Sequence, residues 1–232
     1  MVPQIRNFIA ALQTTESTGS VALYGPGLAV ERRMNAVKHG PAIYAVLQEL
    51  MGEAGITLRD VAVFAAGAGP GSFTGVRVAL AAVKALAYAT GATATAESDL
   101  DVLTFGASKS EWICTVIDAR KAEVYAAVYA PGTNLDPGSR LVAGPWVLPA
   151  TEVVRRAMEL GPVRYVGSGV DAYRSAFPED AAAAPIRAIH LAQLVALRGD
   201  ALRPAGAIYV RPAEAELKFG LAPSHDPLAS LI

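Results

Sequence analysis

One stretch constrains the fold of this chain more than any other. A strand-like apolar run at residues 61–66 enters a glycine-rich loop, and a long alanine-rich helix follows. Glycine adopts backbone conformations that other residues resist, and Thr74 is predicted to cap the helix. The unit predicted is therefore strand, glycine loop, helix. Such a loop can hold an anion through free backbone N–H groups and the positive end of the helix dipole. It can equally be a tight turn that sets the helix close on a sheet, and both interpretations stay open.

The length, composition and net charge of the chain limit the classes of protein to which it can belong. The chain has 232 residues, of which 53% are hydrophobic and 18% charged, so it can bury a large core in one large or two small domains. Its net charge is −1, from 20 basic and 21 acidic residues, which excludes the electrostatic pattern of an autonomous nucleic-acid binder. No apolar run reaches about 18 residues without a charge or a breaker, and a disulfide within the chain is excluded because Cys114 is its one cysteine. We expect a cytoplasmic, non-membrane protein.

The two halves of the sequence open in the same way. Apolar runs at residues 8–12 and 20–24 flank a polar turn that begins at Gln13, and a further strand is expected at 28–32. The runs at 112–118 and 123–129 flank a second polar turn. We therefore predict an internal duplication in an α/β fold. Its two lobes, residues 1–107 and 108–232, resemble the actin-like (ASKHA, ribonuclease-H-like) superfamily and carry mixed sheets.

Two helices of the first half are unusually apolar. The helix expected at residues 39–54 has an apolar stripe of roughly 160°, wider than the usual ~100°, and the helix after the glycine loop is apolar nearly all round. Such a helix is either buried within its own fold or shared with another chain. The partner interface predicted from these helices comprises Ile43, Tyr44, Leu47, Leu50, Met51, Val76, Leu80, Val83 and Lys84.

No complete catalytic constellation is visible in the sequence. Gln13 is neutral and a poor Mg²⁺ ligand, and Asp118 stands beside Arg120 and Lys121, as a solvated turn-stabilising carboxylate often does. Ser72 lacks the Gly-x-Ser-x-Gly spacing of a serine nucleophile. The histidines are His39, His190 and His225, and none has a metal-binding partner at i+3 or i+4. We therefore expect no metal and no other cofactor.

The glycine loop carries a family resemblance. Residues 69–77 read Gly-Pro-Gly-Ser-Phe-Thr-Gly-Val-Arg and closely resemble the hallmark of the TsaB (YeaZ) family. Segments 14–23, 117–125 and 208–212 resemble further family segments in the same order, so that the resemblance extends from about residue 5 to residue 219. The motif residues are Gly69, Pro70, Gly71, Ser72, Phe73, Thr74, Gly75 and Arg77.

The resemblance implies a fold of two actin-like lobes and a role without catalysis of its own. The chain would bind TsaD, the paralogue that transfers threonylcarbamoyl to N6 of adenosine 37 in tRNA. The first two helices would form the bundle with TsaD, or with a second copy in a homodimer when the chain is isolated. TsaE, an ATPase, would join the complex, and tRNA would be met only through it. Gln13 departs from the aspartate usual in the family, which puts a metal or nucleotide role of that turn in doubt.

A different class of function stays open at this point. A small actin-like phosphotransferase, or another nucleotide-binding enzyme, would use the glycine loop for phosphate and Asp118 for Mg²⁺.

Overall fold

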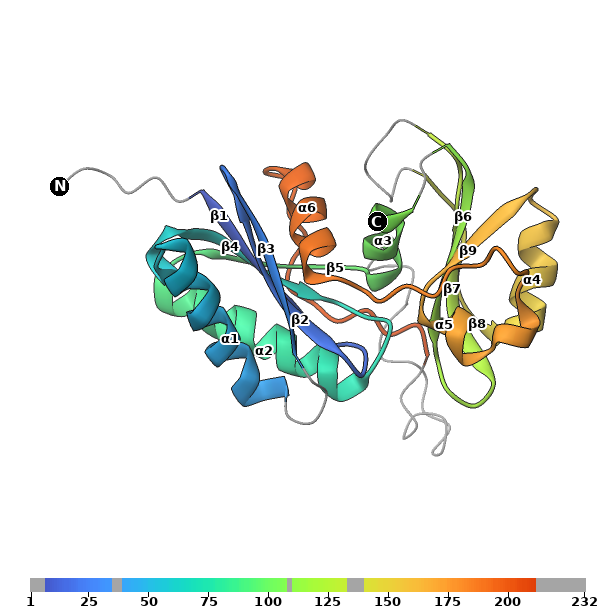
Figure 1. The fold of residues 1–232 in the computed structure, drawn as a ribbon, viewed down its shortest axis with the longest axis horizontal. Coiled ribbons are helices and arrows are strands. Elements are labelled where there is room, and N and C mark those ends of the chain that lie inside the picture. The colour runs from blue at the N-terminus through green and yellow to red at the C-terminus, as the bar shows by residue number, and fades with distance from the viewer. Residues whose placement is uncertain (1–6, 35–38, 108–109, 133–139, 212–232) are drawn as a thin grey trace.

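Two mixed β-sheets with helices packed on them make up the computed structural model (Figure 1). It describes residues 7–34, 39–107, 110–132 and 140–211. The tail beyond Phe219, which the sequence predicts to be loose, lies outside these ranges.

The first sheet has five strands in the order β3-β2-β1-β4-β5. The first three form an antiparallel meander, as expected from the alternating runs and turns, and β4 and β5 join them in parallel. A parallel neighbour needs a crossover connection, which the helices of this half provide. The strands are β1 (Phe8–Gln13), β2 (Gly19–Gly25), β3 (Leu28–Met34), β4 (Val61–Gly67) and β5 (Thr93–Glu97).

The second sheet repeats this pattern with four strands in the order β8-β7-β6-β9. β6, β7 and β8 form an antiparallel meander, and β9 lies parallel to β6 as β4 does to β1. The predicted actin-like fold of two lobes with mixed sheets is thereby confirmed. The boundary at residues 107 and 108 stays a prediction, and residues 108–109 lie outside the described ranges. The strands are β6 (Trp112–Asp118), β7 (Glu123–Tyr129), β8 (Leu141–Pro149) and β9 (Val163–Val166).

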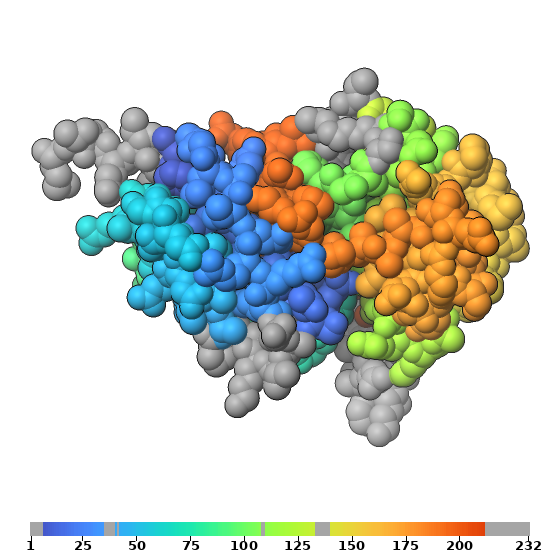
Figure 2. Space-filling view, viewed as in Figure 1, coloured from blue at the N-terminus to red at the C-terminus, as the bar shows by residue number. Residues whose placement is uncertain are grey.

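Three long helices pack on the first sheet. α1 (His39–Ala54) packs on β2 and β3, and α2 (Phe73–Thr90) packs mainly on β4 and β5. The sheet's other face is covered by α6 (Ala188–Arg198), which comes from the C-terminal half of the chain (Figure 1). The chain therefore returns from the second lobe to complete the core of the first. Figure 2 shows the orange segment that leads to α6 crossing the surface between the two lobes. The smaller helices are α3 (Asp99–Leu103), α4 (Ala150–Met158) and α5 (Ser168–Ala172), with 3₁₀ turns at Leu58–Asp60, Thr104–Gly106 and Arg174–Ala176.

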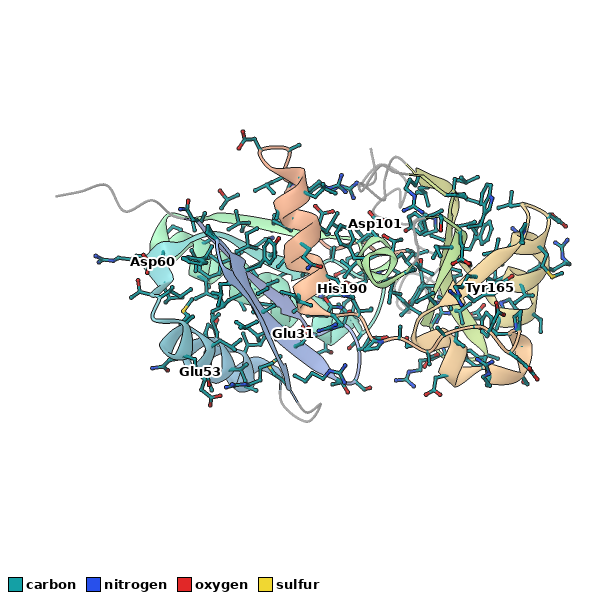
Figure 3. All side chains as sticks on the ribbon, turned by 45° about the horizontal axis from the view of Figure 1, so that its top comes forward. Glu31, Glu53, Asp60, Asp101, Tyr165 and His190 are labelled. Atoms are coloured by element: carbon teal, nitrogen blue, oxygen red, sulfur yellow. The ribbon has the colours of Figure 1, made fainter. Side chains whose placement is uncertain are left out.

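Polar contacts fix the start of α6 on the first sheet. Arg187 pairs with Glu31 of β3 at 2.7 Å, and the backbone N–H of Ala188 donates to Ser20 Oγ at 2.9 Å. Figure 3 shows Glu31 beside His190 of the same helix. Burial, and then the positive charge of Arg187, lower the pKa of His190, so the neutral imidazole is favoured at this junction.

α2 is a long helix of mostly apolar residues. By length and hydropathy alone it could cross a membrane, a property that core helices of globular proteins share. Its apolar side packs against β4 and β5, and the residues buried there are Gly75, Val76, Ala79, Leu80, Ala82, Val83, Leu86 and Ala87. The burial of this side shows that it contributes to the core of the first lobe.

Candidate functional site

The glycine loop packs directly against the turn that follows β1. The backbone N–H of Ser72 donates to the carbonyl of Thr15 at 2.7 Å, and Thr14 Oγ1 donates to the carbonyl of Gly75 at 2.7 Å. A Cβ at Gly75 would lie 1.9 Å from the Thr14 carbonyl oxygen, and one at Gly71 would lie 2.6 Å from that of Thr15. Close approach of two backbones thus accounts for glycine at both positions.

The cap of α2 differs from the one expected. The helix begins at Phe73, and Ser72 is its N-cap, with Oγ accepting from the backbone N–H of Gly75 at 3.2 Å. The prediction that Thr74 caps the helix is wrong, because Thr74 already lies inside the first turn. Ser72 has φ −59° and ψ 117°, outside the helical region, as is typical of an N-cap residue.

A buried polar cluster lies beneath the loop. Gln13, at the end of β1, donates through Nε2 to Thr15 Oγ1 at 2.6 Å and to Asp99 Oδ1 at 3.1 Å. Asp99 opens α3, and its backbone N–H donates to the Gly69 carbonyl at 2.8 Å. Its burial raises the pKa of the carboxyl to about 7, against the opposing effect of hydrogen bonds from Thr15 and Gln13.

This cluster gives a physical reason for Gln13. An aspartate at that position would set a second carboxylate against Asp99 where both side chains are buried, and like charges there repel strongly. The neutral amide donates to Asp99 instead. Asp99 was not predicted as a site residue, because it lies far from Gln13 along the chain.

Asp118, at the end of β6, makes hydrogen bonds that stabilise the turn between β6 and β7. Asp118 Oδ1 accepts from the hydroxyl of Tyr173 at 2.9 Å and from the backbone N–H of Arg120 at 2.7 Å, and Oδ2 pairs with Arg120 at 3.1 Å. Glu16, which follows β1, accepts a hydrogen bond from the backbone N–H of Ile186, just before α6, at 3.0 Å. Burial raises the pKa of the Glu16 carboxyl. Within the described part of the chain, no three His, Cys, Asp or Glu side chains gather as a metal site would require.

The residues predicted as a partner interface divide into two groups. Tyr44, 48% exposed, and Lys84 lie on the surface. The other seven pack into the core between α1, α2 and the first sheet, and are Ile43, Leu47, Leu50, Met51, Val76, Leu80 and Val83. Their own chain already covers them, so a partner would meet the opposite side of the two helices. We call this side the outer helix face, and it comprises Tyr44, Ala45, Gln48, Gly52, Arg77, Ala81, Lys84, Ala85 and Tyr88.

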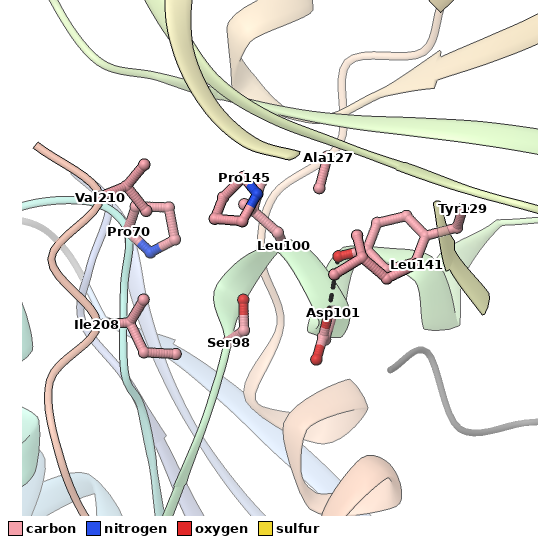
Figure 4. A pocket seen from close by; sticks show the side chains of 10 residues that line it. All are labelled: Pro70, Ser98, Leu100, Asp101, Ala127, Tyr129, Leu141, Pro145, Ile208 and Val210. Atoms are coloured by element: carbon pink, nitrogen blue, oxygen red, sulfur yellow. Dashed lines mark hydrogen bonds between the residues drawn. The ribbon is translucent and has the colours of Figure 1, made fainter. Parts of the chain in front are cut away.

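A small pocket lies between the two lobes (Figure 4). Its floor includes a hydrogen bond from the Tyr129 hydroxyl of β7 to Asp101 Oδ1 of α3, at 2.7 Å. Its free volume of about 10 Å³ holds about one water molecule. The remaining lining residues are mostly apolar and are Pro70, Ser98, Leu100, Ala127, Leu141, Pro145, Ile208 and Val210.

Known proteins resemble this chain in sequence and in architecture. Residues 30–184 match the family model of TsaD, tRNA N6-adenosine threonylcarbamoyltransferase. The chain is 32% identical over 130 residues to the tRNA threonylcarbamoyladenosine biosynthesis protein TsaB of Escherichia coli K12, across 54% of this chain and 56% of that one. It is 47% identical over 68 residues to the tRNA N6-adenosine threonylcarbamoyltransferase of Syntrophobacter fumaroxidans, across 29% of this chain and 20% of that one.

A solved structure extends the similarity to most of the chain. YeaZ from Pseudomonas aeruginosa superposes with a TM-score of 0.73 at 29% identity, over 88% of this chain and 99% of that one. By sequence, the match with E. coli TsaB spans a little over half of that relative's length. The family-model match, the TsaB relatives and the YeaZ-like architecture agree. The chain therefore belongs to the TsaB (YeaZ) family of TsaD-like proteins.

Proposed function

We propose that the chain is a non-catalytic subunit that binds a TsaD-type partner. In this role it supports the transfer of threonylcarbamoyl to N6 of adenosine 37 in tRNA. TsaE joins the complex, the isolated chain forms a homodimer, and tRNA is met only through the assembly. The names of the relatives support a role in threonylcarbamoyladenosine biosynthesis. The net charge of −1 fits a chain that does not bind RNA by itself.

The observation that carries the proposal is the composition of the outer helix face. Small side chains at Ala45, Ala81 and Ala85 let another helix come close, and they alternate with large exposed groups. Tyr88 is 93% exposed and stands beside this stripe, as Tyr44 does on α1. Tyrosines and arginines provide much of the binding energy of protein interfaces, in patches with few acidic groups. A partner that covers this face would bury both tyrosines.

The outer helix face can be tested by introducing a charge and by truncating a tyrosine. Ala85→Glu adds a carboxylate and bulk to the middle of the face, so we expect affinity for the cognate TsaD to fall at least ~100-fold, or about 2.7 kcal/mol. Tyr88→Ala is expected to weaken binding about 30-fold, as loss of a hot-spot side chain does. Isothermal titration calorimetry measures both, and the unfolding temperature of each variant should stay close to that of the unmodified chain.

The matched control lies on the second lobe. Met158 in α4 is 67% exposed, so Met158→Glu adds the same charge to a remote apolar surface and should leave TsaD affinity unchanged. Unaltered binding by Ala85→Glu would refute this face as the interface, as would an equal loss in the Met158→Glu control.

The phosphotransferase alternative requires a carboxylate free to hold Mg²⁺. Asp118 instead accepts from Tyr173 and from the backbone N–H of Arg120, and Gln13 is directed to Asp99. We therefore expect the isolated chain to show no tight ATP binding in calorimetry with Mg²⁺ present. Micromolar or tighter binding by the chain alone would favour the enzyme.

A further inference from the structure

The last described segment, residues 203–211, runs between the two lobes after α6 (Figure 1). We call it the C-terminal strap. It has no regular secondary structure, yet it makes specific contacts with both lobes. None of these contacts belongs to the outer helix face or to the buried cluster around Asp99.

At its first-lobe end the strap is fixed to β5 and to the glycine loop. Thr95 Oγ1 donates to the Arg203 carbonyl at 2.8 Å, and the backbone N–H of Ile208 donates to the Ala68 carbonyl at 2.8 Å. The ring of Tyr209 lies 5.7 Å from that of Phe73 at the start of α2. The strap thus follows the end of β4 into the loop that starts α2.

At its second-lobe end the strap holds the turn between β6 and β7. Arg211 Nη1 donates to the Ala119 carbonyl at 3.0 Å, and Nη2 donates to the Glu123 carboxylate. The guanidinium also lies over the Tyr125 ring, 5.8 Å from its centroid. One side chain therefore contacts both ends of the turn.

The backbone of the β6–β7 turn adopts a conformation that is unfavourable without contacts from other segments. Arg120, Lys121 and Ala122 have φ values of 63°, 56° and 61°. The left-handed region is unfavourable for residues with a Cβ, and three such residues in a row persist only where surrounding contacts determine the conformation. Arg211 supplies two of these contacts from outside the hairpin.

The middle of the strap fills the space between the lobes. Figure 4 shows Ile208 and Val210 beside Pro70 of the glycine loop, with Pro145 of the second lobe across the pocket. Ile208 is buried, and the free space left is about that of one water. Without these side chains the pocket would be a cleft with apolar walls.

We propose that the C-terminal strap is a latch that closes the apolar cleft between the lobes and holds the β6–β7 turn in its left-handed conformation. Release of Arg211 frees the turn and lets the strap leave the cleft, while the strands of both sheets stay paired. This role does not depend on partner binding or on the modification of tRNA.

Hydrogen exchange of the full chain, read by mass spectrometry, tests the latch. In Arg211→Ala we expect amides of residues 119–124 to exchange at least ~10-fold faster, because the turn loses both hydrogen bonds from Arg211. Amides of β1 and β4 should exchange at the rate of the unmodified chain. Arg211→Lys keeps the charge but cannot donate in the same two-pronged geometry, so it should give an intermediate rate. Arg59→Ala, at an exposed arginine of the first lobe, is the matched control and should change nothing in this segment.

A second variant probes the cleft. Ile208→Ser should leave both sheets protected and increase the fluorescence of the apolar dye ANS, because the cleft walls become accessible. Unchanged exchange at 119–124 in Arg211→Ala would overturn the latch. Acceleration spread evenly over both sheets would overturn it as well, since Arg211 would then stabilise the whole fold. Unchanged ANS fluorescence in Ile208→Ser would show that the strap does not close an apolar cleft.

Discussion

Gly75→Ala is expected to lower the free energy of unfolding by about 3 kcal/mol, the upper part of the range for overpacked sites. The new Cβ would lie 1.9 Å from the Thr14 carbonyl oxygen. That oxygen belongs to the backbone just after β1, where the Thr14 hydroxyl also holds the Gly75 carbonyl, so neither side can move without breaking this contact. Urea unfolding followed by circular dichroism measures the effect.

Gly52→Ala is the matched control for this substitution. Gly52 lies within α1, and a Cβ added there meets no atom within 4 Å. Alanine in an exposed helical position is favoured over glycine by about 0.5–1 kcal/mol, so this variant should be slightly more stable. If Gly75→Ala unfolds within 1 kcal/mol of the unmodified chain, the loop and the β1–β2 turn are not packed as closely as described.

The second large effect concerns the charge of Asp99. The folded chain holds the pKa of this carboxyl at about 7, against 3.8 as the ordinary value, so the folded state retains a proton that the unfolded state has lost. Stability from this group is therefore complete below pH ~4 and falls as the pH rises towards 7. Three pKa units correspond to about 4 kcal/mol. Asp99→Asn removes the titration, and its stability relative to the unmodified chain should rise between pH 4 and pH 7 by up to that amount.

Urea unfolding at several pH values from 4 to 8 gives this difference directly. Burial also raises the pKa of Glu16 and Glu97, but both are present in the two proteins, so their effects largely cancel. Asp60→Asn is the control, because hydrogen bonds from the backbone and side chain of Thr57 lower the pKa of Asp60. Its titration therefore lies below pH ~4, and its stability difference from the unmodified chain should stay nearly constant from pH 4 to pH 8. A pH-independent difference between Asp99→Asn and the unmodified chain would show that Asp99 is ionised in the folded protein.

Much of the fold could be predicted because its signals are local. Runs of apolar residues around polar turns located the β1–β2 and β6–β7 hairpins, and α1 occupies the predicted residues 39–54. The N-cap of α2 was misplaced by two residues, because Ser72 and Thr74 are both good caps and only the backbone geometry separates them.

The candidate site was harder to predict because it depends on contacts distant in sequence. An apolar helix surface looks the same whether its own sheet or a second chain covers it, so Leu47 and Leu80 could not be assigned to the core before the sheet was placed. Nothing in the sequence pairs Gln13 with Asp99. Nothing in the sequence shows that α6 packs on the sheet of the other lobe.

The return of α6 to the first sheet has a consequence for synthesis on the ribosome. The face of that sheet formed by Ala11, Ala22 and Ala65 is buried with Leu191 and Leu194 of α6. Roughly 100 residues must be added after the last strand of this sheet before its covering helix is complete, which takes about 5–20 s at typical elongation rates. During that interval the nascent sheet exposes an apolar surface, a natural site for chaperone attachment. A prematurely terminated product that lacks α6 would keep this surface and would tend to aggregate.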